Sequence, residues 1–61
     1  MKKEQAMIEY EYAKIELLFY ESCYKKAING ENYTLAQSYG ESCEECESYM
    51  DYLRTQIYEE N

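Results

Sequence analysis

Three cysteines are the residues of this chain best suited to metal or redox chemistry. Cys43 and Cys46 lie three residues apart in the stretch SCEECESY, which places both thiols on one face of a helix, and Cys23 lies upstream. A structural zinc site needs four ligands, and this chain has no histidine to supply one. Nearby glutamates raise the pKa of a thiol and so disfavour the reactive thiolate. We therefore predict cysteines that pack as small apolar side chains, with no metal or cofactor, and keep a cysteine-based metal or redox protein as an alternative.

The thirteen acidic side chains contain many adjacent carboxylates that resemble acid–base pairs. A catalytic carboxyl has to be held in a cleft that shifts its pKa, whereas acids on the outer face of a helix stay solvated. The chain also lacks a serine–histidine or cysteine–histidine pair and a glycine-rich phosphate loop. We expect the protein not to be an enzyme.

The formal net charge of −7 belongs entirely to the second half of the chain. Residues 1–30 carry five acids and five lysines, whereas residues 31–61 carry eight acids against Arg54 alone. Negative charge opposes contact with phosphate backbones and anionic lipid surfaces. We therefore expect no direct nucleic acid partner and no membrane partner.

The short length and the amino-terminal residues indicate where the protein works and what stabilises it. A chain of 61 residues buries only about 60% of the surface that its unfolded form exposes, so self-association, a metal or disulfides usually assist. Three cysteines cannot all pair within one chain. No apolar segment follows Lys2 and Lys3, so we predict no signal peptide and a cytoplasmic location.

The distribution of helix formers and breakers predicts an all-α fold. The chain has no proline, and strong helix formers fill both halves around the segment NGENYT. We expect one domain over residues 1–61, with helices at about 3–28 and about 35–59 and a turn at 29–34. A short connection makes two such helices antiparallel neighbours, so the unit is a two-helix hairpin.

Particular residues mark the predicted helix ends. Asn29 and Gly30 tolerate the left-handed conformation that closes a helix. Thr34 and Gln37 have the spacing of a capping box that opens the second helix. Gly40 lies inside that helix, where we expect it to allow close approach of the other helix.

The two helices differ in the number of their apolar stripes. The second helix has one stripe, formed by Leu35, Tyr39, Ser42, Cys46, Tyr49, Leu53 and Ile57. The first helix has two, one of which is formed by Ala6, Tyr10, Ala13, Leu17, Tyr20, Tyr24 and Ala27. The other stripe consists of Ile8, Tyr12, Ile15, Phe19 and Cys23. Because large and small residues alternate along the alanine–tyrosine stripe, we expect it to face the second helix, with the reverse assignment left open.

A hairpin partner covers one stripe of the first helix and leaves the other exposed. We predict that a second copy covers it, so that Ile8, Tyr12, Ile15, Phe19 and Cys23 form the interface of a homodimeric four-helix bundle. In size and layout this dimer resembles the small RNA-binding bundle regulators of colicin-type plasmids. Those proteins bind RNA through positive charge on their helices, and this chain is neutral or acidic there, so the resemblance implies an architecture and no function.

The composition favours a protein that binds another protein. Nine tyrosines, one phenylalanine and no tryptophan suit contact surfaces, where tyrosine is enriched. We predict a small acidic regulator that modulates another protein by docking on a basic surface, and one version of this prediction places that surface at a nucleic-acid-binding site. The predicted contact residues are Glu41, Glu44, Glu45, Asp51, Tyr52, Tyr58 and Glu59. The alternative is an assembly subunit whose exposed first-helix stripe packs on a larger protein.

Overall fold

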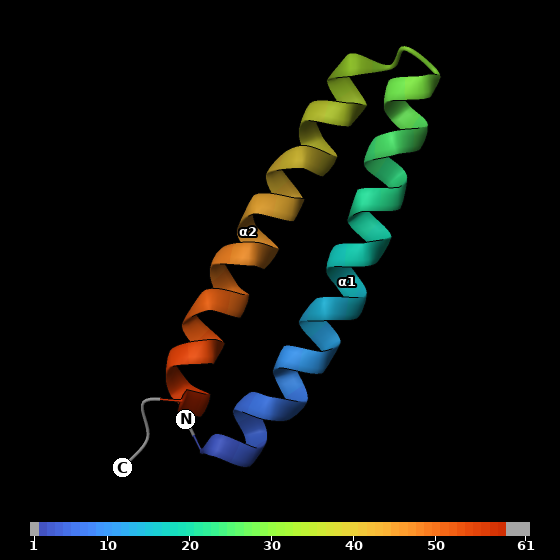
Figure 1. The fold of residues 1–61 in the computed structure, drawn as a ribbon. Helices are drawn as coiled ribbons and strands as arrows, with labels where there is room; N and C mark the ends of the chain where they lie inside the picture. Colours follow the sequence, from blue (N-terminus) through green and yellow to red (C-terminus); the bar gives the residue numbers. More distant parts are fainter. Residues whose placement is uncertain (1, 59–61) are drawn as a thin grey trace.

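The structure, a computed structural model, describes residues 2–58 and arranges them as two long helices side by side (Figure 1). Helix α1 spans Lys3–Asn29 and helix α2 spans Tyr33–Tyr58, and no strand occurs among these described residues. The helices run antiparallel, so the start of α1 and the end of α2 lie together, opposite the turn (Figure 1). The predicted all-α hairpin is confirmed, with α1 ending one residue later and α2 beginning two residues earlier than expected.

The turn closes α1 by a pair of backbone hydrogen bonds around a left-handed residue. Glu31 has φ of 60°, and its N–H donates to the carbonyl of Ile28 at 3.0 Å. The N–H of Asn32 donates to the carbonyl of Ala27 at 2.9 Å. This is the Schellman arrangement, in which the last free carbonyls of a helix are satisfied by the two residues that follow its cap.

The residues predicted to adopt the left-handed conformation do not adopt it. Asn29 is the last helical residue, and Gly30 is the cap with φ of −88°. The prediction that these two residues supply the left-handed conformation is therefore wrong. Because α1 continues through Asn29, the left-handed position moves to Glu31, a residue whose β-carbon makes that conformation unfavourable.

Helix α2 is capped by an asparagine rather than by the predicted threonine. The Oδ1 atom of Asn32 accepts a hydrogen bond from the N–H of Leu35 at 3.2 Å. That contact, from the cap to the third helical residue, is the standard way to satisfy a free amide at a helix start. Thr34 already lies inside α2, so the predicted capping box with Gln37 is wrong.

A single layer of side chains between the helices forms the core. The buried residues are Ala6, Ala13 and Ala27 from α1 and Ala36, Cys46, Met50, Leu53 and Ile57 from α2. Tyr10 and Leu17 pack against them, and Leu53 has no exposed surface. The alanine–tyrosine stripe thus faces α2, which confirms the favoured assignment and rules out the reverse one.

The hairpin is long and thin, with Cα extents of 48 × 14 × 12 Å. Its accessible surface is 4830 Å², against roughly 4200 Å² for a compact folded chain of the same mass. Two helices in contact bury only the sides that face each other. Each helix therefore keeps a full outer side in solvent, and the composition of these two outer sides decides what the molecule can contact.

Candidate interaction surfaces

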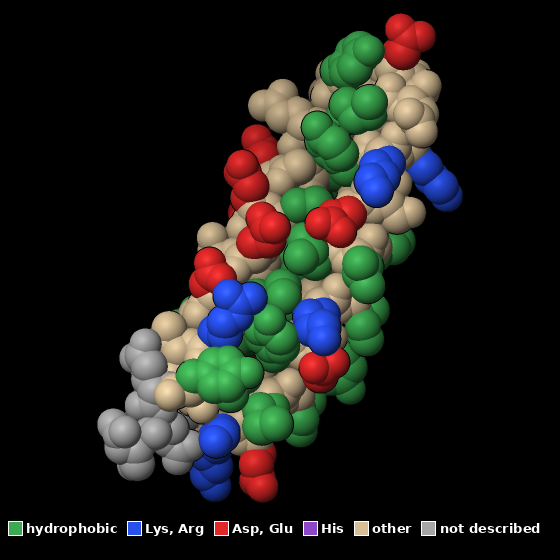
Figure 2. All heavy atoms as spheres, in the orientation of Figure 1, with side chains coloured by type: hydrophobic (Ala, Val, Ile, Leu, Met, Phe, Trp, Pro, Cys, Tyr) green, Lys and Arg blue, Asp and Glu red, His purple; other side chains and the backbone are tan. Residues whose placement is uncertain are grey.

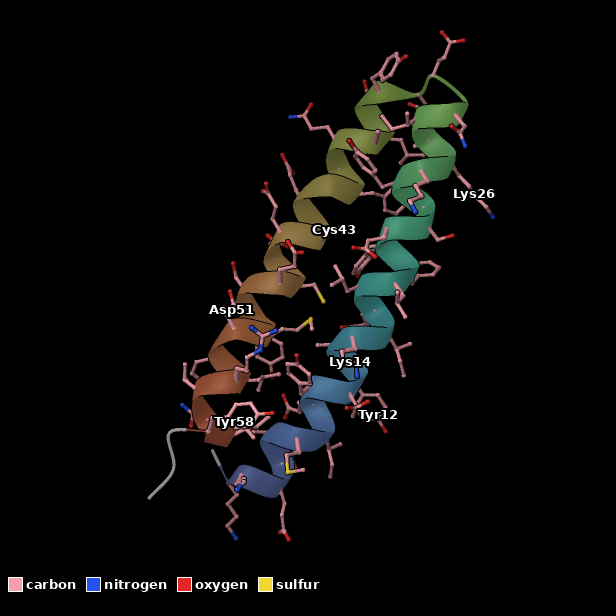
Figure 3. The ribbon with its side chains drawn as sticks, viewed as in Figure 1. Tyr12, Lys14, Lys26, Cys43, Asp51 and Tyr58 are labelled. Carbon is pink, nitrogen blue, oxygen red and sulfur yellow. The ribbon has the colours of Figure 1, made fainter. Side chains whose placement is uncertain are left out.

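The exposed apolar stripe of α1 lies on the side away from α2. Ile8 and Ile15 each follow a buried alanine by two residues, a step of about 200° around a helix. We call the line formed by Ile8, Tyr12, Ile15 and Phe19 the α1 outer row, and its side chains are 52%, 65%, 63% and 61% exposed. Figure 2 shows apolar side chains along this edge, and Figure 3 shows Tyr12 directed away from α2.

Other apolar side chains lie on the margins of the α1 outer row. Cys23, predicted to belong to it, is half-buried. Leu18 is 67% exposed and extends the apolar surface around α1, although the stripe pattern did not assign it. Its position next to Leu17 was the available signal, because neighbouring residues of a helix point about 100° apart and one α2 helix cannot cover both. The row with these margins is a broad convex surface rather than a cleft.

The predicted partner-binding residues share the outward side of α2. We call Glu41, Glu44, Glu45, Asp51, Tyr52 and Tyr58 the α2 outer face, and all six side chains are exposed. Glu59, the seventh predicted residue, lies outside the described residues. Figure 2 shows acidic side chains gathered along the edge of α2 that is farthest from α1. Glu41, Glu44, Glu45 and Tyr52 point away from α1, whereas Asp51 and Tyr58 lie at the margin of the face, where Asp51 lines a pocket with Leu17 and Tyr58 lines one with Ile8.

Asp51 differs from the other acids of this face because a cation pairs with it. The Nη1 atom of Arg54 lies 3.3 Å from the Asp51 Oδ1 atom, and its Nη2 atom donates to the Tyr10 hydroxyl at 3.1 Å. The guanidinium also lies 5.8 Å from the centre of the Tyr10 ring. Arg54 thus links α2 to α1 and offsets the charge of Asp51. Among the described residues, no cation forms an ion pair with Glu41, Glu44 or Glu45.

A network of side chains holds Tyr52 in place. Its ring stacks on Tyr49, with ring centres 6.2 Å apart and an angle of 21° between planes. The Tyr49 hydroxyl donates to Glu9 Oε1 on α1, and Gln5 donates to Glu9 Oε2 at 2.9 Å. The hydrogen bond from Tyr49 is the main cause that lowers the pKa of Glu9, and the same bond raises the pKa of Tyr49. The Tyr49–Tyr52 spacing of three residues was the sequence signal for this support, which the stripe analysis missed.

The cysteines pack in and beside the core. Cys46 is buried, and its thiol donates to the carbonyl of Ala13 at 3.1 Å. Burial, followed by nearby glutamates, raises the pKa of both Cys43 and Cys46, so both are neutral thiols near pH 7. The Cys23 side chain hydrogen bonds Tyr39 and raises the pKa of its phenol. Within residues 2–58, no three cysteine, aspartate, glutamate or histidine side chains are grouped to hold a metal ion.

Comparison with protein family models, curated proteins and solved structures finds no match for this chain. The resemblance to the plasmid bundle regulators therefore stays one of size and layout. Neither described helix has an apolar stretch of the length and hydropathy that crossing a membrane requires. The features of the structure that bear on function are the α1 outer row and the α2 outer face.

Proposed function

We propose that this protein is a small acidic cytoplasmic regulator that binds another protein through the α2 outer face and modulates it. The observation that carries the proposal is the set of three exposed glutamates, Glu41, Glu44 and Glu45, none of which forms an ion pair with a cation of residues 2–58. Exposed aromatic side chains, Tyr52 and Tyr58, share the face with them. Charge that is not offset within its own molecule steers and orients a partner of opposite sign.

The chemistry of the face defines the partner as a protein with a basic surface. Acids on successive turns of a helix lie about 5–6 Å apart, which is comparable to the spacing of phosphates along a nucleic acid strand. One version of the proposal is therefore a protein whose nucleic-acid-binding site the α2 outer face occupies. The neutral thiols of Cys43 and Cys46 are compatible with the reducing cytoplasm in which such a regulator would act.

Self-association through the α1 outer row is the second part of the proposal. Four large apolar side chains in one line form a patch at the upper end of what a soluble monomer usually leaves in water, and patches of that size are often contact sites. A second copy of the same row is the simplest cover, and the four-helix bundle expected from the sequence is one way to build that dimer.

An assembly subunit is the competing function, and the direction of the α1 outer row favours it specifically. Because the row points away from α2, the hairpin could lay this whole side of α1 on a larger protein without opening. In that case the isolated chain stays monomeric or aggregates, whereas the regulator forms a defined dimer. The mass in solution separates the two functions.

Charge reversal on the α2 outer face tests the binding proposal. The chain is immobilised by its amino terminus and used to capture partners from native extract, alongside a Glu44→Lys/Glu45→Lys variant. A Glu21→Lys/Glu31→Lys variant makes the same change in charge away from the face and serves as the control. We expect a partner retained by the native chain and the control but lost from the variant. A partner that the variant captures equally well would overturn the proposal.

A further inference from the structure

The direction of the α1 outer row decides which kind of dimer it can build. In a four-helix bundle with a square cross-section, each helix contacts two neighbours that lie about 90° apart around its axis. The buried stripe and the outer row of α1 are separated by about 140°, counted at about 100° per residue. The exposed fractions agree that the two stripes lie on different sides of α1, because Ala6 and Ala13 are buried while Ile8 and Ile15 are exposed. A second copy on the outer row would therefore lie about 40° out of the plane of the hairpin, nearer to that plane than to the 90° corner of a square bundle.

We propose that two copies join through their α1 outer rows into one layer of four helices, in the order α2, α1, α1, α2. The inference rests on the self-association proposed above and specifies its architecture in place of the bundle. The two α1 helices occupy the middle of the layer. The two α2 helices form its opposite edges, and both α2 outer faces point outward into solvent.

The spacing and the polarity of the residues along the outer side of α1 read the same in both directions. Gln5 and Ser22 are polar residues at the two ends of the α1 outer row, and the four apolar residues lie between them. An antiparallel pair related by a two-fold axis needs such a pattern, because each end of one copy meets the other end of its partner. The axis then passes between Tyr12 and Ile15. Ile8 faces Phe19 of the second copy, and Tyr12 faces Ile15 of the second copy.

The charges beside the α1 outer row favour the same orientation. Glu4, Glu11, Leu18 and Lys25 lie on one flank of the row, in one line at spacings of seven residues, and Glu11 is already paired with Lys14 at 3.6 Å. In the antiparallel pair Glu4 comes near Lys25 of the second copy, whereas a parallel pair would place the lysines of both copies together at each end. The other flank carries two acids, Glu9, which Tyr49 and Gln5 already engage, and the exposed Glu16, so the preference for this orientation comes from the Glu4–Lys25 flank alone.

The charge distribution over the whole chain also fits a second copy as the occupant. Each chain carries −7, yet residues 1–30 are balanced, so two copies can approach through α1 without net repulsion. The layer places the acidic residues of α2 as far apart as the assembly allows. From the exposed fractions, the row contributes roughly 500 Å² per copy, which brings the pair close to the ~1000 Å² that a specific interface needs.

The layer has a consequence for the proposed function. Both α2 outer faces remain free in the dimer and point in opposite directions, so one dimer offers two equivalent acidic faces. A bundle would bring the α2 helices of the two copies near each other and crowd their charges. We therefore expect each dimer to bind two partner molecules, or one partner that has two-fold symmetry.

Nuclear Overhauser contacts between isotopically labelled and unlabelled native chains, mixed in equal amounts, test the layer. We expect contacts between copies from the Ile8 methyls to the Phe19 ring and from the Ile15 methyls to the Tyr12 ring, and none that involve Leu53 or Tyr52 of α2. Contacts between copies to α2 would establish a bundle and overturn the layer while leaving self-association standing. Contacts between Ile8 of the two copies would overturn the antiparallel orientation. A monomeric mass with no contacts between copies would overturn the layer and self-association together.

Discussion

The outer sides of α1 and α2 occupy equivalent places in the hairpin, but they carry opposite kinds of side chain. The side of α1 away from the core presents Ile8, Tyr12, Ile15 and Phe19, whereas the same side of α2 presents Glu41, Glu45, Ser48, Tyr52 and Thr55. The hairpin itself does not require this difference, because neither side touches the other helix. The contrast is what we would expect if the two sides made different contacts outside the hairpin, apolar through α1 and electrostatic through α2, as proposed above.

The largest effect should come from placing a charge in the α1 outer row. We expect Ile15→Glu to weaken dimerisation by at least ~100-fold, because the two-fold axis brings two buried carboxylates together. The helix content should stay unchanged, since the side chain is exposed in the hairpin. Sedimentation equilibrium measures the effect.

Ser48→Glu is the matched control for that change. It introduces the same side chain at an outer position of α2, and we expect the dimer to remain. A dimer lost equally in both variants would show that added negative charge, rather than the place of the charge, controls association. That result would remove the contrast between the two outer sides.

The second largest effect should be a difference between the two surfaces in their dependence on salt. Contacts between exposed charges are screened at high ionic strength, whereas burial of apolar surface is not. Between about 50 mM and about 500 mM NaCl, we expect partner binding to weaken by more than ~10-fold and the dimer constant to change by less than ~3-fold. Titration calorimetry measures partner binding, and sedimentation equilibrium measures dimerisation. Equal salt dependence of both would contradict the assignment of one apolar and one electrostatic surface.

A change in the turn should stabilise the hairpin without affecting either outer side. We expect Glu31→Gly to raise the free energy of unfolding by about 1 kcal/mol, because glycine accepts φ of 60° without the clash of a β-carbon. Thermal unfolding at fixed protein concentration measures the gain. Glu31→Ala removes the same charge and keeps the β-carbon, so it should give no comparable gain. Equal stabilisation by both variants would assign the effect to charge.

Gly40→Ala should give a smaller gain. A β-carbon at this position would lie 3.5 Å from the Tyr24 Cε2 atom, an ordinary van der Waals contact. The close approach expected at Gly40 is therefore made by a side chain and leaves space for a methyl group. We expect stabilisation of up to ~1 kcal/mol from helix propensity, measured by urea unfolding. A clear loss of stability would show that the helices pack more tightly here than this contact indicates.

The smallest effect concerns the dependence of stability on pH. The pKa of Glu9 is lower in the folded chain than its ordinary value of 4.5, chiefly through the hydrogen bond from Tyr49. Its contribution to stability is therefore complete above the unfolded pKa and is lost as the pH falls through the folded pKa. We expect Tyr49→Phe to lose less stability than the native chain on acidification, followed by circular dichroism. Tyr52→Phe, which leaves the Glu9 hydrogen bond intact, should behave like the native chain.

Hydrophobic periodicity was sufficient to predict the hairpin and its buried faces. The alanine–tyrosine stripe was identifiable because alanines recur on one side of α1 at spacings of seven and fourteen residues, and large residues of α2 fill the space beside them. The helix ends were harder to predict, because several residues were suited to each turn and cap position. Glu31 adopts the left-handed conformation in the turn and Asn32 caps α2, although Gly30 and Thr34 were also suited to these roles. The residue at which α1 ends determined which residues occupy these positions.

The contacts that support the α2 outer face could not be predicted from a pattern within one helix. The pairing of Arg54 with both Asp51 and Tyr10, and the bond from Tyr49 to Glu9, depend on how far α2 is shifted along α1. That shift is set by the turn, in which the sequence pattern predicted other residues for the left-handed and cap positions than the ones that occupy them. The predicted contact residues of the face, by contrast, followed from helical spacing alone, and the six described ones are exposed in the hairpin.

The central claim is that a second copy covers the α1 outer row, and the mass of the native chain in solution tests it most directly. The chain has a mass of 7.4 kDa. By sedimentation equilibrium under reducing conditions, we expect twice that mass at protein concentrations of tens of micromolar, with dissociation on dilution. A folded helical chain that keeps the mass of one copy at concentrations several times higher would contradict the claim.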